Sequence, residues 1–255
     1  MAGDDVILVV EDVVKRFGGV VAVDHCSFSV RRGTITGLIG PNGAGKTTLF
    51  NIIAGFYRPD SGRIWFEGRR IDGLPPHRIF ARKIARTFQI PRELKRMTVL
   101  ENLMLVPEHQ CGERLFDAWF RPRRVRRQEE AIRRQAEEVL KFVKLDHLRD
   151  AYAANLSGGQ KKLLELARTM MSEARLILLD EPGAGVNPTL MRDLVGYIQH
   201  LREMGRTFLL IEHDMDLVME ICNPVIVMSN GRLLMEGTPE EVRRDPRVLE
   251  VYLGA

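Results

Sequence analysis

The sequence predicts an α/β fold: a mostly parallel sheet with helices, an N-terminal antiparallel β element and an inserted α-helical subdomain. Short apolar runs that precede helices, such as Leu176–Leu179, are typical of strands buried on both faces of a parallel sheet. Between 91 and 171 the pattern becomes helical with no convincing β run, which indicates an insertion. We expect one domain over 1–255, with 1–90 and 172–255 forming its core and 91–171 forming the helical subdomain.

The composition is that of a soluble globular protein. Of 255 residues, 45% are hydrophobic and 28% are charged, and no apolar run is long enough to cross a bilayer. The acidic start lacks a basic leader, which argues against a signal peptide. Cys26, Cys111 and Cys222 are scattered, so they fit a reducing compartment and suggest neither a metal site nor disulfides.

The net charge of +4 is unevenly distributed. Residues 69–96 carry nine Lys or Arg and two acids, and residues 121–134 carry seven Arg and two Glu. Such basic blocks suit nucleic acid, anionic lipid headgroups or an acidic partner. For the second block a solvated helix face is an equally good interpretation, because a helix of alternating charge begins there, over 125–143.

The N-terminal part favours antiparallel strands, because two β-type runs, Val6–Val14 and Ser27–Val30, occur with no helix between them. A turn that contains Phe17 ends the first run. An exposed Phe17 would stack on a purine ring, but taken alone a buried core position is the better interpretation of this residue.

An apolar run at Thr34–Ile39 leads into a glycine-rich turn and then a helix from Thr47. This is the phosphate-loop pattern G-x-x-x-x-G-K-[ST] in its strand–loop–helix setting. Its glycines let successive backbone N–H groups converge on phosphate oxygens, and Lys46 adds positive charge near the β and γ phosphates. Thr47 offers a hydroxyl to Mg²⁺. The expected nucleotide contacts are Gly40, Pro41, Asn42, Gly43, Ala44, Gly45, Lys46, Thr47 and Thr48.

Further strand and helix signals follow the phosphate-loop helix. A strand is expected at Arg63–Glu67 and a short helix at Pro76–Lys83. The next expected strand, Ile84–Gln89, ends at Gln89, whose side chain can join a water and metal shell there, with a plain loop position as the alternative. Thr98 is the expected N-cap of the following helix.

Acidic side chains end the apolar run Leu176–Leu179. Asp180 is placed to reach Mg²⁺, and Glu181, which points to the other side, is placed to take a proton from an attacking water. A solvated acidic pair is the alternative, and the preceding strand and the phosphate loop weigh against it. His213 follows the next strand, and strand C-termini share one edge with the phosphate loop, so we expect this histidine to sense the γ-phosphate.

The segment Leu156–Gln160 (LSGGQ) opens a helix whose apolar side chains fall on one stripe. Ser157, Gly158, Gly159 and Gln160 would form a second anion-binding helix end, with a hydroxyl and bare backbone N–H groups. Because the chain already has a phosphate loop, we expect this segment to bind the nucleotide held by another copy or by a related subunit.

The C-terminal part alternates helices and strands, so both sides of the insert belong to one nucleotide-binding unit. Asn230-Gly231 predicts a hairpin turn. The expected elements are helices at Pro188–Met204 and Met215–Ile221, strands at Thr207–Ile211, Pro224–Met228 and Arg232–Glu236, and short helices from Pro239 and Pro246.

Taken in order, GPNGAGKT, a glutamine-containing loop, LSGGQ, LILLDEP and the histidine of IEHD resemble the ATP-binding subunits of ABC transporters. The resemblance covers nearly the whole chain and implies the ABC ATPase fold, with its P-loop NTPase core, and hydrolysis of ATP with Mg²⁺. It implies a head-to-tail dimer with two ATP, each between one phosphate loop and the opposite LSGGQ. It also implies adenine stacking by Phe17, Mg²⁺ binding and coupling by Gln89, and a catalytic base in Glu181.

A narrower resemblance is carried by RTFQIPRELKRMTVLENLML, LSGGQKKLLELAR and the ending GTPEEVRRDPRVLEVYLG. These segments are similar to the ATP-binding subunits of bacterial branched-chain amino-acid importers, whose close relatives serve urea or short amides. Asn187, where many ABC proteins have Asp, is common in this group.

The narrower resemblance also implies partners and a location. The partners are a second copy in a homodimer, or a paralogous ATP-binding subunit in a heterodimer, then membrane permease subunits, and indirectly a periplasmic or extracellular solute-binding protein. The location is the cytoplasmic face of the inner (plasma) membrane of a bacterial cell, as a peripheral protein. Motion would pass to the permease through 89–104, with 69–96 towards that partner or the inner leaflet.

The alternative is a non-transport ABC ATPase that acts on nucleic acid or ribosomes through the basic blocks. Such proteins usually carry long coiled-coil arms or two ATPase units in one chain, and this sequence has neither. A phosphate-loop kinase or GTPase leaves LSGGQ unexplained and lacks a guanine-reading NKxD motif. We therefore expect no nucleic-acid partner.

Overall fold

The computed structural model describes residues 5–87, 93–113 and 115–253, which form two compact units. The first unit comprises Met1–Gln89, Ala174–Ala184 and Val195–Ala255, and the second comprises Ile90–Glu173 and Gly185–Leu194. From the sequence we expect residues 185–194 in the core, whereas the structure groups Gly185–Leu194 with the second unit. One reason is close packing: a Cβ on Gly159 would lie 2.3 Å from the Leu190 side chain.

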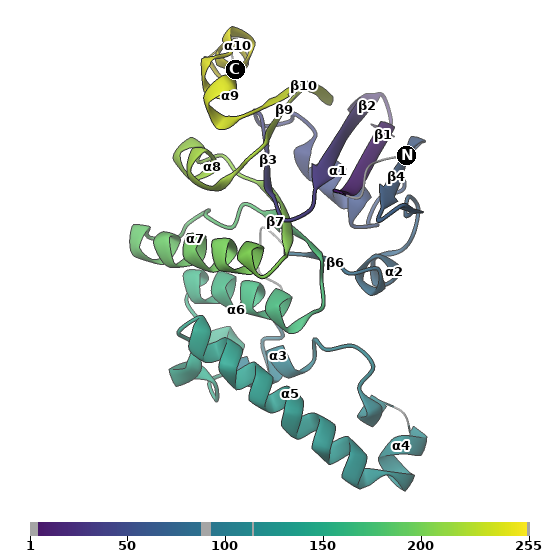
Figure 1. Ribbon diagram of the computed structural model, residues 1–255, viewed down its shortest axis with the longest axis vertical. Coiled ribbons are helices and arrows are strands. Elements are labelled where there is room, and N and C mark those ends of the chain that lie inside the picture. Colours follow the sequence, from purple (N-terminus) through teal and green to yellow (C-terminus); the bar gives the residue numbers. More distant parts are fainter. Residues whose placement is uncertain (1–4, 88–92, 114, 254–255) are drawn as a thin grey trace. The chain divides into compact units, whose positions relative to one another are not determined.

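The first unit contains a six-stranded sheet made of β3 (Ile35–Ile39), β6 (Ile84–Arg86), β7 (Leu176–Asp180), β8 (Thr207–Ile211), β9 (Val225–Ser229) and β10 (Arg232–Gly237). The strand order is β10-β9-β3-β8-β7-β6. Figure 1 labels five of these strands, β10, β9, β3, β7 and β6. All neighbours are parallel except β9 and β10, which form the expected hairpin. Every residue of β3, β7 and β8 is buried, as their continuous apolar runs predict.

A four-stranded antiparallel sheet in the same unit consists of β1 (Val6–Phe17), β2 (Val20–Arg31), β4 (Ser61–Phe66) and β5 (Arg69–Arg70), in the order β2-β1-β4-β5. β2 begins at Val20, whereas the sequence pattern placed its start at Ser27. The β1–β2 register shifts several times, and His25 has a left-handed backbone with φ of 53°. Such irregularities disturb the apolar–polar alternation from which a strand is recognised.

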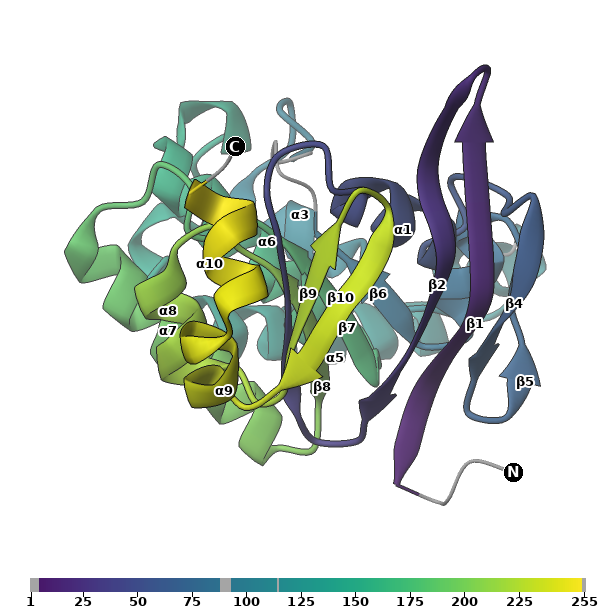
Figure 2. The same cartoon turned by 90° about the horizontal axis from the view of Figure 1, so that it is seen from above.

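Helix α1 (Lys46–Ile53) lies between the two sheets (Figure 2). Its Leu49, Phe50 and Ile53 are fully buried in a core shared with strands of both sheets. The other helices of this unit are α2 (Pro76–Ala81), α8 (Met215–Ile221), α9 (Pro239–Arg244) and α10 (Pro246–Leu253), and each begins where the sequence predicts. Helix α7 (Pro188–Glu203) has residues in both units.

The second unit contains helices and loops and no strand within its described residues, apart from an isolated bridge between Thr98 and Tyr152. Its helices are α3 (Val99–Met104), α4 (Leu115–Phe120), α5 (Pro122–Phe142) and α6 (Gly158–Met171), with 3₁₀ turns at Cys111–Glu113, Asp146–Leu148 and Ala153–Asn155. Thr98 caps α3 as expected, in a capping box with Glu101. None of the described helices, in either unit, has the length and apolar character that a bilayer-crossing segment requires.

Candidate functional site

The loop between β3 and α1 has the backbone that its glycines predict. Gly40, Gly43 and Gly45 all have positive φ, of 147°, 80° and 96°. A Cβ on Gly45 would lie 2.2 Å from the carbonyl oxygen of Ala22, so no larger residue fits there. At Gly43 a Cβ would meet no atom within 4 Å, so this part of the loop faces open space.

The start of α1 is open to an anion. Its N-cap is Gly45, which supplies no side-chain hydrogen bond to the first turn. Because the first N–H groups of a helix have no intrahelical partner, they can bind phosphate oxygens here. Lys46 is buried, and its Nζ donates to the carbonyl oxygens of Gly40 (2.7 Å) and Pro41 (2.9 Å). The pKa of Lys46 is lowered, because the effect of burial exceeds the opposing effect of the nearby Glu181 and Asp180 carboxylates.

The carboxylate of Asp180 lies at the end of β7 and has one oxygen without a partner. Its Oδ2 accepts a hydrogen bond from Arg86 Nη2 at 2.9 Å, whereas its buried Oδ1 has no partner within the described residues. Burial raises the pKa of Asp180 and the Arg86 charge lowers it, with a net rise. A cation beside Oδ1 would favour the charged form, so this side chain suits a metal ligand.

Sequence reasoning missed Arg86, which organises this carboxylate. It lies on β6, and its Nη1 donates to Asn51 Oδ1 on α1 at 2.7 Å while Nη2 reaches Asp180 on β7. Asn51 in turn donates to the carbonyl oxygen of Thr47, the residue expected to offer a hydroxyl to Mg²⁺. The sequence shows only an arginine within a short expected strand, and the parallel pairing of that strand with β7 is seen in the structure alone.

Glu181 and His213 come together as the sequence predicts for neighbouring strand ends. Glu181 Oε1 lies 2.8 Å from His213 Nε2, although the two residues are 32 positions apart. Glu181 has a left-handed backbone with φ of 49°, and its N–H donates to the carbonyl oxygen of Ile211 on β8. A non-glycine residue in this region costs about 1–3 kcal/mol. The surrounding structure therefore fixes where this carboxylate points.

Glu212, which sequence reasoning also missed, holds the two loops that carry this pair. The side chain is buried, and its Oε1 accepts from the Gly183 N–H at 2.7 Å, two residues after Glu181. Its Oε2 accepts from the N–H of His213 at 3.1 Å. The one cue is an acidic residue directly after a fully apolar strand and directly before the histidine.

Phe17 is 44% exposed, so its interpretation as a buried core residue is wrong. The ring packs edge-on against Tyr57 with centroids 5.2 Å apart, and Lys15 Nζ lies 5.5 Å from its centroid. The ring is thus braced by neighbours while much of its surface stays accessible, which is what stacking on a base requires.

The LSGGQ segment lies in the second unit and closes the start of α6 with its own side chains. Ser157 Oγ accepts from the Gln160 N–H at 3.3 Å, and Gln160 Oε1 accepts from the Ser157 N–H at 2.9 Å. Gly158 is exposed, and a Cβ there would meet no atom within 4 Å. Gln89, the remaining expected site residue, lies outside the described residues.

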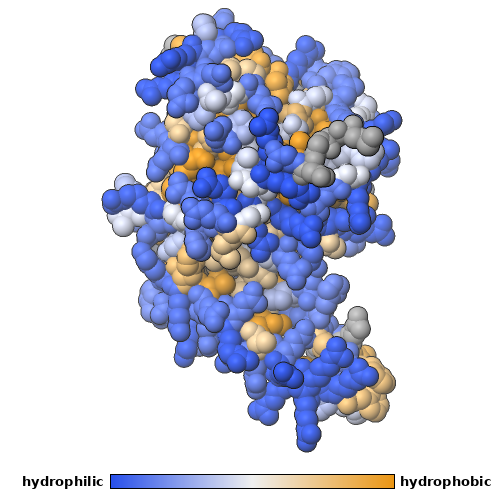
Figure 3. Space-filling model, viewed as in Figure 1, coloured by the Kyte–Doolittle hydropathy of each residue, from blue (hydrophilic) through white to orange (hydrophobic). Residues whose placement is uncertain are grey.

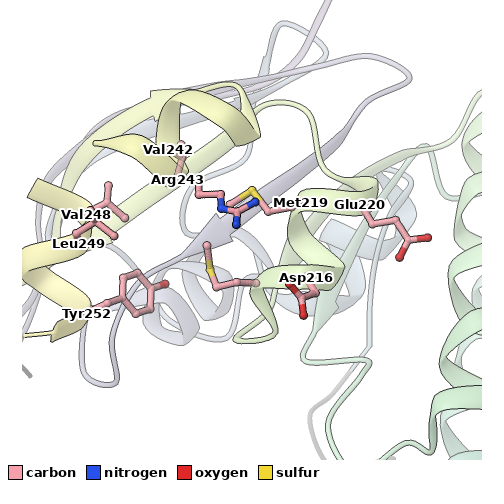
Figure 4. A pocket seen from close by; sticks show the side chains of 9 residues that line it. Asp216, Met219, Glu220, Val242, Arg243, Val248, Leu249 and Tyr252 are labelled. Atoms are coloured by element: carbon pink, nitrogen blue, oxygen red, sulfur yellow. The ribbon is translucent and has the colours of Figure 1, made fainter. Parts of the chain in front are cut away.

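Two further features concern metal ligands and cavities. No group of three or more His, Cys, Asp or Glu side chains that could hold a metal occurs within the described residues. Helices α8, α9 and α10 also surround a mainly apolar cavity of about 550 Å³, with Val248, Leu249 and Tyr252 on one side and Met219 on another (Figure 4).

Comparisons with known proteins agree with these features. A family model described as ABC transporter matches residues 23–184, and one described as branched-chain amino acid ATP-binding cassette transporter matches residues 232–255. A probable branched-chain amino acid transport ATP-binding protein LivG of Archaeoglobus fulgidus is 48% identical, over 98% of this chain and 96% of its own. The high-affinity branched-chain amino acid transport ATP-binding protein BraF of Pseudomonas aeruginosa is 42% identical, over 97% and 98%.

The chain is also similar to solved structures of ABC transporter ATP-binding cassettes. A nucleotide-free ATP-binding cassette from an ABC transporter superposes with a TM-score of 0.84 at 41% identity, over 98% of this chain and 100% of that one. These matches confirm the ABC ATPase fold and the resemblance carried by the motifs, and they do not favour a nucleic-acid or ribosome ATPase. The chain belongs to the ABC transporter family, whose ATP-binding subunits hydrolyse ATP to power transport.

Proposed function

We propose that this chain powers an importer for branched-chain amino acids or a related small polar solute such as urea or a short amide. The observation that carries the proposal is full-length similarity to proteins named as branched-chain amino acid transport ATP-binding proteins. The family match over residues 232–255 supports it separately, because β10, α9 and α10 contain none of the phosphate-binding motifs.

For hydrolysis we assign the role of general base to Glu181. Its carboxylate accepts a proton from the attacking water as the water oxygen bonds to the γ-phosphorus and the bond to ADP breaks. His213, 2.8 Å away, orients the carboxylate, and Glu212 fixes the backbone of both loops. The pair is therefore positioned before substrate binds, which reduces the entropy lost on reaching the transition state.

The phosphates would be held by the loop from Gly40 to Thr48 and by Lys46, and the adenine would stack on Phe17. Mg²⁺ would be held by Thr47, Asp180 and Gln89. When bound, this ion neutralises charge on the β and γ phosphates. The buried Asp180 Oδ1 without a described partner supports its place in this set.

The proposed assembly is a head-to-tail dimer, formed with a second copy or with a paralogous ATP-binding subunit. Ser157, Gly158, Gly159 and Gln160 would contact the nucleotide of the opposite subunit. Support comes from an exposed helix start whose glycine N–H groups suit an anion, on a unit separate from the phosphate loop. Separate permease subunits would carry the solute, with this chain on the cytoplasmic face of the membrane and a solute-binding protein on the other side.

The experiment is reconstitution in proteoliposomes with permease subunits and a binding protein from the same genome. Labelled leucine or urea is supplied on the side of the membrane that carries the binding protein. We expect ATP-dependent leucine accumulation that is lost in Glu181→Gln and retained in the exposed control Glu203→Gln. ATP hydrolysis without accumulation of any of these solutes would overturn the solute assignment while leaving the ATPase assignment intact.

A further inference from the structure

Helix α4 carries a cluster of exposed apolar side chains that the nucleotide chemistry does not use. Leu115, Phe116, Trp119 and Phe120 are 87%, 62%, 81% and 69% exposed, and Leu115 and Trp119 are the two most exposed large hydrophobic residues of the described chain. Single exposed apolar residues are ordinary, but four within six residues mark an interaction surface.

The cluster is held on a defined support. Asp117, on the opposite face of α4, is buried and accepts from Arg121 Nη1 at 3.5 Å. The rings of Phe116 and Phe120 lie 4.9 Å apart, and the Arg121 guanidinium lies 5.9 Å from the Phe116 centroid. These contacts order the helix, so the exposed rings are presented without a large further loss of conformational freedom on binding.

Positive charge borders the cluster. Over Leu115–Arg127 the chain has five arginines and one acid, and Arg123, Arg124, Arg126 and Arg127 on the first turns of α5 are all exposed. Among the described residues, the ion pairs of these arginines are Arg121 with Asp117 and Arg126 with Glu130, the latter at 3.7 Å. Figure 3 shows the apolar atoms at the position of α4 beside the hydrophilic atoms of α5.

We propose that α4 and the first turns of α5, residues 115–127, form a surface that binds an anionic lipid bilayer. The aromatic rings would enter the headgroup boundary, and the arginines would pair with lipid phosphates. Trp, Phe and Leu on one helix next to Arg is the composition of interfacial helices. Anionic leaflets attract such basic segments. A nucleic acid would use the charges but gives an exposed leucine no partner, so a bilayer satisfies both features.

The inference does not depend on the proposed solute or on ATP hydrolysis, so its test uses the full chain without nucleotide. Vesicles rich in phosphatidylglycerol and vesicles of phosphatidylcholine alone are compared by flotation at low and high salt. Trp65 and Trp119 are the two tryptophans. In a Trp65→Phe background, Trp119 alone reports insertion, through a blue shift of its emission and quenching by brominated lipids.

We expect binding to anionic vesicles that weakens with salt, with a blue shift of Trp119. Phe116→Ser with Trp119→Ser, or Arg123→Glu with Arg124→Glu, should weaken binding at least about tenfold. The matched controls are Tyr152→Ser with Met204→Ser, which remove exposed apolar groups elsewhere, and Arg31→Glu with Arg244→Glu, which reverse two exposed charges elsewhere. These controls should bind as the unaltered chain does.

Three results would overturn the proposal. The first is equal binding of the test variants and their controls, and the second is binding to RNA or heparin with none to vesicles. The third is a requirement for residues 115–127 only in binding detergent-solubilised permease, which would make the surface a protein contact. Circular dichroism of each variant separates loss of binding from loss of the fold.

Discussion

Two helix starts in this molecule are expected to meet nucleotide, and they are built differently. Helix α1 begins after Gly45, which gives its first turn no side-chain cap, and the carbonyl oxygen of Ala22 leaves no room for a Cβ at this position. Helix α6 begins after Ser157, whose capping box with Gln160 satisfies donors at its own start. A Cβ on Gly158 would meet open space.

The difference separates two ways of preparing an anion site. At α1 the glycines are required by the fold itself, and the vacant N–H groups are left for a ligand. At α6 the side chains hold the helix start without any ligand, and Gly158 has room for a larger residue, whereas Gly159 packs closely against Leu190. We therefore expect substitutions at α1 to damage folding and function together, and substitutions at α6 to separate them.

The largest expected effect is on the chemistry beside α1. Glu181→Gln keeps a hydrogen-bond partner for His213 but cannot accept a proton, so ATP hydrolysis should fall roughly 10²- to 10⁴-fold. ATP binding should persist, and gel filtration with ATP should then show a dimer. Phosphate release and nucleotide binding are the measurements, and Glu203→Gln is the control. Normal turnover in Glu181→Gln would remove this residue from its assigned role.

The next effect tests the fold's demand for glycine at α1. Gly45→Ala places a Cβ 2.2 Å from the Ala22 carbonyl oxygen at a φ of 96°. It should lower the free energy of unfolding by about 1–3 kcal/mol, because backbone strain adds to the clash. Urea unfolding measures the loss, and nucleotide binding should be lost with it. An alanine variant as stable as the parent would contradict the geometry described for the loop.

The matched substitution at α6 is expected to behave in the opposite way. Gly158→Ala adds a methyl group in open space at the first helical residue, so stability should stay equal or rise by about 0.4–1 kcal/mol. ATPase activity should nevertheless fall, because the added group faces the nucleotide of the opposite subunit in the proposed dimer. Equal activity would argue against that contact.

The same two regions show how far sequence reasoning reaches. The phosphate loop, the helix start at LSGGQ and the acids at the end of β7 are local patterns formed by residues near one another in the chain. They could be predicted because a turn or cap of this kind has few sequence solutions. The expected roles of Thr47, Asp180 and Gln89 towards Mg²⁺ remain proposals.

Arg86 and Glu212 could not be predicted, because their partners are set by sheet register. Arg86 reaches Asp180 only because β6 and β7 are parallel with Arg86 opposite Leu178. Glu212 reaches the N–H of Gly183 across two strand ends. The exposure of Phe17 likewise depends on a hairpin that extends further than its sequence pattern, since β2 begins at Val20.

A smaller effect tests whether the cap at α6 is structural. Ser157→Ala removes the oxygen that accepts from the Gln160 N–H and should cost about 1 kcal/mol of local stability. Hydrogen exchange in the first turn of α6 is the measurement. Ser157→Asp should retain the cap, because Asp and Ser are comparable N-caps, while its charge repels ATP in the proposed dimer. Activity lost without faster exchange in Ser157→Asp would separate the two roles of this residue.

The smallest effect uses pH to compare α3, which is capped by a carboxylate, with α1, whose N-cap is Gly45. Hydrogen bonds from the backbone and side chain of Thr98 lower the pKa of Glu101 from its ordinary 4.5. Because the folded-state pKa is lowered, the ionised Glu101 carboxylate stabilises α3 above about pH 4.5. This stabilisation is lost as the pH falls through the lowered value. Amide exchange at Glu101 should therefore accelerate in acid relative to Glu101→Gln, whose amide oxygen keeps the capping box at every pH. The first turn of α1 has no carboxylate in its cap, so its exchange should be the same in both proteins. An equal acceleration at α1 would mean that acid loosens the first unit by another route, and the contrast between the two helix starts would then not depend on their caps.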